Sequence, residues 1–272
     1  MRFAILGPLR MTGVGAPTVP KAPKQRQLLA LLLLNANQVV PVGVCIKELW
    51  DDQPPDSALS TLQTYVLHLR RVLCGVPEIG TMRAAKQVLA TAERGYRFSV
   101  PDGSLDLHLF DEGVRKARDA LADGDDARGS ALLARALDMW EGRALTGVQA
   151  GPVLRAHAAM LEEYRLSVQE TRIEADLRLA RHHELIGELS ALATRHPTNE
   201  NVRAQLMLAL YRSGRQAHAV EAYQRLRRTL SADLGLDPSP RMRRFLQAML
   251  ENHPSLNSPA AAGAGAAGDR SA

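Results

Sequence analysis

The chain has 272 residues, of which 46% are hydrophobic and 23% are charged, and this composition predicts a folded chain with room for two domains. No apolar run approaches the ~20 residues of a membrane-spanning helix, and the N-terminus lacks a cationic leader before a long apolar stretch, so we expect neither a membrane protein nor a secreted one. Residues 1–100 hold 12 Lys and Arg against 6 Asp and Glu, a net +6, whereas the remainder holds 22 against 23, a net −1, which together make +5.

The sequence of the N-terminal third predicts two short strands, three helices and a hairpin, in that order. Strand-like pieces at residues 2–6 and 9–12 precede an apolar helix over 25–35 and a shorter helix over 42–50. Residues 87–100 alternate apolar and polar side chains and predict a hairpin, with Gly95 supplying the turn. Two strands, three helices and a closing hairpin are the order of a winged helix-turn-helix.

The third helix of this region, residues 57–74, has two different faces. Its apolar face would pack on a core and is formed by Leu62, Val66, Leu69 and Leu73. Its opposite face carries small hydrogen-bonding groups followed by cations, a pattern that suits a helix lying in the major groove of DNA. The alternative is an ordinary surface helix with a solvated charged side.

The pattern gives each candidate DNA-binding residue a role. We expect base contacts from Ser60, Thr61, Gln63, Thr64 and His68, and phosphate contacts from Arg70 and Arg71. Arg94 at the hairpin tip would reach the flanking backbone or minor groove, with Arg97 as the second candidate. Lys24 and Arg26, at the start of the first helix, would hold phosphates.

The connection between the second and third helices, residues 51–56, carries three carboxylates in a region that is otherwise basic. Acidic groups repel phosphate, so the connection should point away from DNA, and its paired prolines stiffen it. The alternative is a simple capping turn in which Asp56 or Ser57 closes the start of the next helix.

Domain boundaries follow from composition. The sequence predicts a DNA-binding domain over 1–101, a helical domain over 104–252, and a disordered Ala/Gly-rich tail over 254–272. Amphipathic helices of the second domain are predicted at residues 107–122, 126–140, 152–181, 183–195, 200–212, 216–232 and 238–251.

The helical part repeats itself weakly, with the spacing of a tetratricopeptide repeat over 208–226. There Gly214 would close a helix turn, and Ala217, Ala219 and Ala222 would let the second helix pack tightly beside Tyr223. A degenerate copy is predicted 31 residues earlier, with His183 in place of the glycine and Leu192 in place of the tyrosine, and a third around Gly124 with Ala127 and Ala131. A generic helical bundle is the alternative.

Motifs for catalysis and cofactor binding are absent from the sequence. It contains neither of the glycine-rich phosphate-binding patterns and no Gly-x-Ser-x-Gly nucleophile motif. Cys45 and Cys74 are lone cysteines that suit a reducing cytoplasm, and the adjacent His182 and His183 would point about 100° apart on a helix, which disfavours a metal site. We therefore expect no enzyme, no cofactor and no metal.

Seven short motifs resemble one known family along residues 1–250. They are Ile5-Leu-Gly-Pro-Leu, Glu48-Leu-Trp, Ser57-Ala-Leu-Ser-Thr-Leu-Gln-Thr-Tyr-Val-x-x-Leu-Arg-Arg-x-Leu, Gly95-Tyr-Arg-Phe, Leu137-x-x-Trp-x-Gly-x-Ala-Leu, Tyr211-Arg-Ser-Gly-Arg-Gln-Ala and Leu234-Gly-Leu-Asp-Pro-Ser-Pro. The chain resembles the Streptomyces antibiotic regulatory proteins, a family of transcriptional activators. One departure is at the wing, where many relatives have Arg-Gly-x-Gly-Tyr and this chain has Ala92-Glu-Arg-Gly-Tyr, so that Arg94 sits closer to the turn.

The resemblance implies an α+β winged helix-turn-helix of the OmpR type, followed by an all-α, tetratricopeptide-like bacterial transcriptional activation domain. It implies a cytoplasmic, nucleoid-associated activator that binds direct repeats in double-stranded DNA upstream of secondary-metabolite (antibiotic) genes, as two copies. It also implies recruitment of RNA polymerase, through its sigma factor and in second place its alpha subunit, with Asp51, Asp52 and Gln53 as contacts. The alternative from another class is a tetratricopeptide adaptor whose basic N-terminal domain binds protein.

Overall fold

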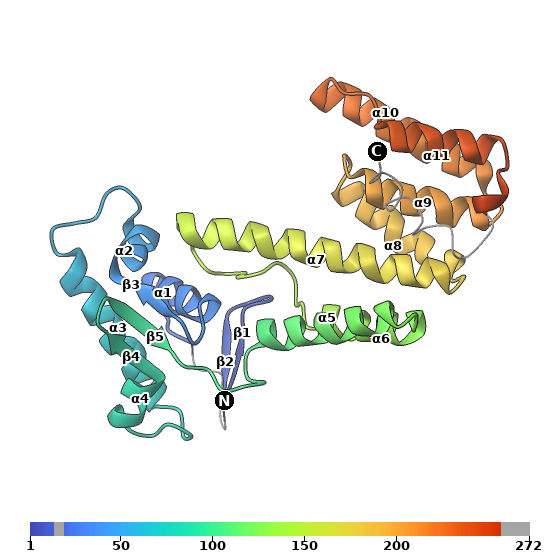
Figure 1. Cartoon of the computed structure of the whole chain (residues 1–272). Coiled ribbons are helices and arrows are strands. Elements are labelled where there is room, and N and C mark those ends of the chain that lie inside the picture. Colours follow the sequence, from blue (N-terminus) through green and yellow to red (C-terminus); the bar gives the residue numbers. More distant parts are fainter. Residues whose placement is uncertain (14–18, 257–272) are drawn as a thin grey trace, which may run out of the picture. The chain divides into compact units, whose positions relative to one another are not determined.

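The computed structural model describes residues 1–13 and 19–256 (Figure 1). The chain divides into two compact units, one formed by residues 1–115 and 135–166 and the other by residues 116–134 and those from 167 on. The predicted fold class is confirmed: an α+β winged helix comes first and helices follow.

The first unit begins with the antiparallel strands β1 (Arg2–Ala4) and β2 (Arg10–Thr12), in which Phe3 lies opposite Met11. The two predicted strands are therefore confirmed, although both are shorter than expected. Later parts of the chain also pair with this region, because Phe3 forms a parallel bridge with Leu105 and Pro8 forms one with Thr146.

Three helices and a second small sheet complete the winged helix. The helices are α1 (Pro23–Leu34), α2 (Val42–Trp50) and α3 (Ala58–Cys74), each within two residues of its predicted bounds. The sheet contains β3 (Val39–Pro41), β4 (Leu89–Ala92) and β5 (Gly95–Phe98) in the antiparallel order β3-β5-β4. A short helix that the sequence analysis missed, α4 (Met82–Val88), precedes the hairpin and is capped by the Thr81 hydroxyl.

Gly95 has a different role from the one predicted. The two-residue hairpin turn is Glu93–Arg94, and Gly95 is already the first residue of β5. A Cβ atom at position 95 would lie 2.0 Å from the carbonyl oxygen of Val40, so glycine is required by the close approach of β3 rather than by the turn.

The core of the winged helix is built around α1. Every residue from Leu28 to Leu33 is at most 1% exposed, which explains why this helix is apolar all round. Phe98 of β5 is fully buried and meets the Phe3 ring edge-on, with the ring centroids 5.4 Å apart. Burial of each such side chain stabilises the fold by roughly 1.5–3 kcal/mol.

The remaining helices are α5 (Asp106–Ala122), α6 (Asp126–Leu137), α7 (Pro152–Arg178), α8 (His182–Arg195), α9 (Glu200–Arg212), α10 (Gln216–Leu234) and α11 (Pro240–Leu250). All seven were predicted. Residues 135–166 nevertheless belong to the first unit, where Phe110 makes edge-on contacts with Trp140 and Tyr164 at centroid distances of 5.6 and 5.3 Å. The compact units thus differ from the predicted domain ranges.

In the second unit α9 packs against both α8 and α10. The turns between helices share one geometry: Gly124, Ala180 and Gly214 all have positive φ, at 80°, 61° and 73°. The residue after each donates its N–H to the carbonyl oxygen five residues earlier, at 2.9 Å (Asp125), 3.0 Å (Arg181) and 2.9 Å (Arg215).

This geometry corrects the predicted repeats. The turn that matches Gly214 is at Ala180, 34 residues earlier, which is the tetratricopeptide period, and not at His183. The fifth and ninth residues after each turn are buried, and they are Gly129 and Leu133, Leu185 and Leu189, and Ala219 and Tyr223. Of the small residues predicted to pack, Ala219 and Ala222 are buried, whereas Ala127, Ala131 and Ala217 are exposed.

The predicted disordered tail begins too early. Pro254–Leu256 form a 3₁₀ turn, Leu256 is buried, and its carbonyl oxygen accepts a hydrogen bond of 2.7 Å from Arg212 Nε. The rest of the predicted tail, residues 257–272, lies outside the described part of the chain.

Candidate nucleic-acid interface

The two predicted faces of α3 are confirmed by burial. The predicted apolar residues Leu62, Val66, Leu69 and Leu73 are at most 2% exposed. Among the predicted contacts on the other side, Ser60, Gln63, Thr64 and Arg71 are exposed, whereas Thr61 is half-buried. Ser60 and Thr64 use their hydroxyl hydrogens within the helix, donating to the carbonyl oxygens of Ser57 and Ser60. Their hydroxyl oxygens still offer acceptors to a ligand.

Two exposed leucines lie among these polar residues, and the sequence analysis did not single them out. Leu59 is 50% exposed and Leu67 is 39% exposed. Leu67 stands three residues after Thr64 and four before Arg71, so it shares their stripe on the helix. Its place within the otherwise polar pattern predicted to face DNA was the available signal, since apolar side chains recognise thymine methyl groups.

His68 is held by α1. Gln25 Nε2 donates a hydrogen bond of 2.8 Å to His68 Nδ1, and the ring is half-buried. An accepting Nδ1 leaves the proton of a neutral imidazole on Nε2, so the opposite edge of the ring is a donor. The helix thus presents a histidine whose orientation is fixed from behind.

Arg70 is tied to the wing, and this differs from its predicted place on phosphate. Its Nε donates to the carbonyl oxygen of Leu89 at 2.9 Å and its Nη2 to Thr91 Oγ1 at 2.8 Å. Partial burial lowers the pKa of the Arg70 guanidinium. Arg70 therefore links α3 to β4.

The hairpin places its two predicted arginines at exposed positions. Arg94 is in the two-residue turn, as predicted, and its carbonyl oxygen accepts a hydrogen bond of 3.0 Å from the Val42 N–H at the start of α2. Arg97 lies on β5 opposite Val39 and Ala90. A cation at the tip of a rigid hairpin is a suitable group for a narrow groove.

Lys24 and Arg26 lie close to other parts of the first unit, and their predicted phosphate role stays a prediction. Lys24 Nζ donates to the carbonyl oxygen of Leu49 near the end of α2. Arg26 Nη2 lies close to Gly147, because a Cβ atom added at that glycine would be 3.4 Å from it. Arg26 Nε is buried and has no hydrogen-bond partner in the described residues. The Lys24 bond therefore links the start of α1 to the end of α2.

The comparisons with known proteins agree on a winged-helix part followed by a helical part. Residues 16–98 match the model for the C-terminal domain of transcriptional regulatory proteins, and residues 105–250 match the bacterial transcriptional activator domain. The regulatory protein DnrI of Streptomyces peucetius is 43% identical over 94% of both chains. The regulatory protein AfsR of Streptomyces coelicolor is 39% identical over 94% of this chain but only 25% of its own length.

The chain belongs to the Streptomyces antibiotic regulatory protein family. Its members are DNA-binding transcription regulators. A solved structure of Mycobacterium tuberculosis EmbR, in complex with a low-affinity phosphopeptide, superposes with a TM-score of 0.85 at 36% identity and covers 94% of this chain and 68% of that one. In the part of this family member that the structure describes, no helix is both long and apolar enough to cross a bilayer.

The acidic connection of this family member, residues 51–56, is exposed, and its first two carboxylates are paired. Lys47 Nζ contacts Asp51 Oδ1 at 2.7 Å and Asp52 Oδ1 at 2.5 Å, and these hydrogen bonds raise the pKa of the Lys47 ammonium. Asp51 has a positive φ of 56° at the end of α2. Ser57 makes no side-chain capping bond to α3, so the alternative of a capping turn at that residue is wrong.

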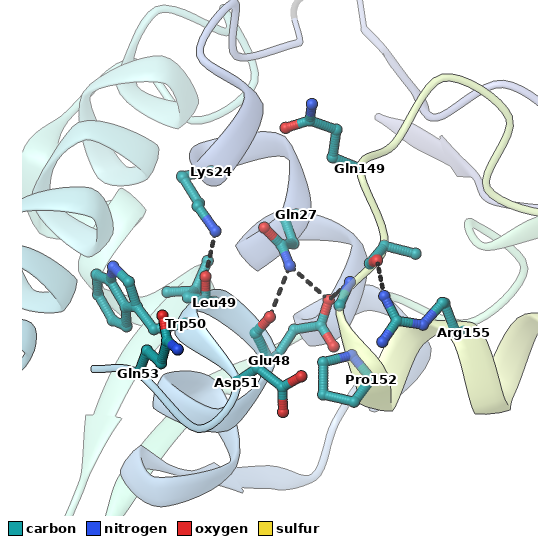
Figure 2. Close-up of a pocket in the computed structure, with 12 residues that line it drawn as sticks. Lys24, Gln27, Glu48, Leu49, Trp50, Asp51, Gln53, Gln149, Pro152 and Arg155 are labelled. Atoms are coloured by element: carbon teal, nitrogen blue, oxygen red, sulfur yellow. Dashed lines mark hydrogen bonds between the residues drawn. The ribbon is translucent and has the colours of Figure 1, made fainter.

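A pocket of about 370 Å³ lies next to this connection (Figure 2). One wall is formed by residues near the end of α2, including Trp50, Asp51 and Gln53, and the other by residues at the start of α7, including Gln149 and Arg155. The Trp50 ring also stacks on Tyr65 of α3, with centroids 6.3 Å apart. The end of α2 therefore adjoins both α3 and α7.

Proposed function

We propose that this family member activates transcription by binding direct repeats upstream of secondary-metabolite genes and recruiting RNA polymerase. The observation that supports DNA binding is the exposed stripe of α3, in which Ser60, Thr64, Leu67 and Arg71 lie over a fully buried apolar face. Helical spacing of three and four residues puts these side chains on one side of the helix, as a major-groove reader requires.

The proposed DNA contacts follow the geometry of each side chain. Gln63, Thr64 and the Nε2 edge of His68 would contact bases, Leu67 a thymine methyl group and Arg71 phosphate. Arg94, with Arg97 second, would contact the flanking backbone or minor groove. Arg70, Lys24 and Arg26 would support the interface through their internal contacts.

The test of DNA recognition is binding of the purified protein to promoter fragments during a salt titration. Replacement of Thr64 or His68 by Ala should relax sequence preference at single positions and cost ~1–3 kcal/mol there. Leu67→Ala should reduce discrimination at one thymine. If these variants keep both affinity and preference, the groove assignment is wrong; if the protein binds no promoter fragment, the adaptor function replaces it.

Two molecules are proposed to bind head to tail, because direct repeats do not have the two-fold symmetry of a palindrome. The repeats should be spaced near one turn of B-DNA, ~10–10.5 base pairs, or a multiple. Insertion of half a turn between them should abolish cooperative binding. Cooperativity that survives this insertion would exclude the arrangement.

Recruitment of polymerase is proposed to use Asp51, Asp52 and Gln53, toward basic parts of the sigma factor beside the −35 element. The exposure of both carboxylates supports this surface. Asp51→Asn with Asp52→Asn keeps side chains that tolerate a positive φ, so the connection should retain its shape. Transcription in a purified system should fall while DNA affinity stays normal.

The matched control for this double variant is Lys47→Gln. It breaks the same ion pairs but leaves both carboxylates in place. It should therefore support transcription at least as well as the unaltered protein. A loss of transcription in the control, or normal transcription in the double variant, would contradict a carboxylate contact with polymerase.

A further inference from the structure

Glu48, on α2, is a carboxylate with almost no access to solvent. It is 1% exposed, and its Oε1 accepts hydrogen bonds from Gln27 Nε2 at 2.8 Å and from the Gly151 N–H at 2.6 Å. Its Oε2 accepts from the Leu154 N–H at 2.9 Å. Two of these three donors are backbone groups at the start of α7, about a hundred residues further along the chain. Figure 2 shows the bond from Gln27 to Glu48.

The backbone of the same segment lies directly on α2. A Cβ atom at Gly151 would be 2.0 Å from the carbonyl oxygen of Glu48. Any side chain at position 151 would therefore push the start of α7 away from Glu48. Glycine at 151 and glutamate at 48 are thus two halves of one contact.

A buried carboxylate is costly unless hydrogen bonds and favourable charge compensate for its lost hydration. The first turn of a helix supplies both, since its N–H groups lack partners within the helix and carry partial positive charge. α7 begins at Pro152, so the N–H groups of Gly151 and Leu154 are of this kind. Glu48 thus caps a helix that is remote in sequence, and its burial requires that helix to stay in place.

Glu48 and Gly151 both line the pocket, so this contact joins its two walls. The residues that follow Glu48 include the first part of the acidic connection, and residues 149–152 with Arg155 form the opposite wall. If the start of α7 moved away from Glu48, the distance between these walls would no longer be fixed. The Glu48 carboxylate would then lose its backbone donors and would need hydration by water.

We propose that Glu48 is a positioning residue for transcription activation, whose carboxylate seats the start of α7 on α2 and so holds the acidic connection and residues 149–155 as one rigid surface. This inference rests on the proposed polymerase contact of residues 51–53. Glu48 contacts neither DNA nor polymerase in this scheme. Its effect is on the shape of the surface that the polymerase meets.

The test uses the full-length protein and two variants that disturb the contact from opposite sides. Glu48→Gln puts an amide N–H₂ or a weaker carbonyl acceptor against the α7 donors, and Gly151→Ala adds the Cβ that cannot fit. The matched control is Gly187→Ala in α8, where an added Cβ meets nothing within 4 Å. Each protein is measured for DNA affinity, transcription in a purified system and amide hydrogen exchange.

We expect both variants to keep normal DNA affinity and to lose transcription to about the extent of the Asp51→Asn, Asp52→Asn protein. The amides of residues 151 and 154 should exchange about tenfold faster, the factor that corresponds to one lost charge-assisted hydrogen bond. Gly187→Ala should behave as the unaltered protein in all three measurements.

Three results would overturn the proposal. The first is normal transcription despite faster exchange at residues 151 and 154, and the second is unchanged exchange in both variants. The third is a loss of DNA affinity that parallels the loss of transcription. That result would mean that Glu48 acts on the fold of the DNA-binding helices. Failure of the polymerase contact itself has a different signature, namely normal transcription by the Asp51→Asn, Asp52→Asn protein.

Discussion

Adjacent arginines on α3 occupy different surroundings and should have separable effects. Arg71 is exposed on the stripe that carries the proposed base-contacting residues, whereas Arg70 donates to Leu89 and Thr91 of β4. Helical periodicity places both arginines near the polar side of α3. Which one bonds to β4 depends on how α3 lies against β4 in the folded structure.

We predict that Arg71→Ala weakens binding to all DNA sequences alike and reduces the slope of log affinity against log salt by about one unit. Arg70→Ala should instead lower the free energy of unfolding by about 1–3 kcal/mol, since it leaves the Leu89 carbonyl and the Thr91 hydroxyl without this donor. Fluorescence anisotropy during a salt titration and thermal unfolding separate the two effects. Equal changes in both measurements for both variants would contradict this division of roles.

His182 makes the stability of the second unit sensitive to mild acid. Its Nδ1 is buried without a hydrogen-bond partner in the described residues, and burial together with the charges of Arg212 and His183 lowers the pKa of the ring. The unfolded chain has an ordinary histidine pKa of ~6.5 and so binds the proton more readily. Stability is therefore lost as the pH falls through that value, down to the lowered pKa of the folded state.

We predict that His182→Gln reduces the drop in thermal unfolding temperature between about pH 7.5 and 5.5, because the glutamine does not titrate. His218→Gln, which changes an exposed histidine of α10, is the matched control and should keep the full drop. The explanation fails if both substitutions leave the same pH dependence.

At the scale of elements, the helix-pair turns were located from the sequence but one was placed in the wrong register. Gly214 and Gly124 were found because glycine is the usual residue at a positive φ. Ala180 carries no such signal, and aligning Leu192 with Tyr223 placed the predicted turn at His183. The 34-residue period becomes visible only through the backbone angles and the shared hydrogen bond of the turn.

The turn at Ala180 should be a site of removable strain. An alanine at a φ of 61° is held in a left-handed conformation that costs an L-residue roughly 1–2 kcal/mol. We predict that Ala180→Gly raises the free energy of unfolding by about 0.5–1 kcal/mol. This is less than the strain relieved, because glycine also adds conformational entropy to the unfolded chain. Gly214→Ala should lower it by about 1 kcal/mol or more. Urea unfolding of both proteins tests this pair, and a destabilised Ala180→Gly protein would refute it.

At the scale of the whole molecule, composition predicts a domain boundary near residue 101, but hydrogen bonds join residues on the two sides of that boundary. The N–H of Phe3 donates to the carbonyl oxygen of Ser104 at 2.7 Å, and the Asp106 carboxylate accepts from the N–H groups of Ile5 and Leu6. The N–H of Leu145 donates to the carbonyl oxygen of Ile5 at 3.0 Å. Such pairs join residues a hundred or more positions apart, and no local pattern in the sequence predicts them.

We predict that a fragment of residues 1–101 is less stable than the same region in the full chain. It lacks the Ser104 and Asp106 acceptors of the N–H groups of residues 3, 5 and 6, and the two α7 donors of Glu48. Each lost hydrogen bond costs about 1 kcal/mol. Hydrogen exchange at Leu28–Leu33, the buried part of α1, compares the region in both proteins. Equal protection in the fragment and the full chain would show that the later residues do not support this core.

The link between Arg70 and β4 has a consequence for the DNA itself. Because α3 and the hairpin are joined, the distance from the proposed base-contacting stripe to Arg94 at the hairpin tip is set by the protein and cannot adjust to each DNA site. A site whose minor groove is too wide or too narrow beside the core bases must deform to bind, and the energy of that deformation depends on its sequence. Flanking base pairs that touch no side chain would then contribute to promoter choice.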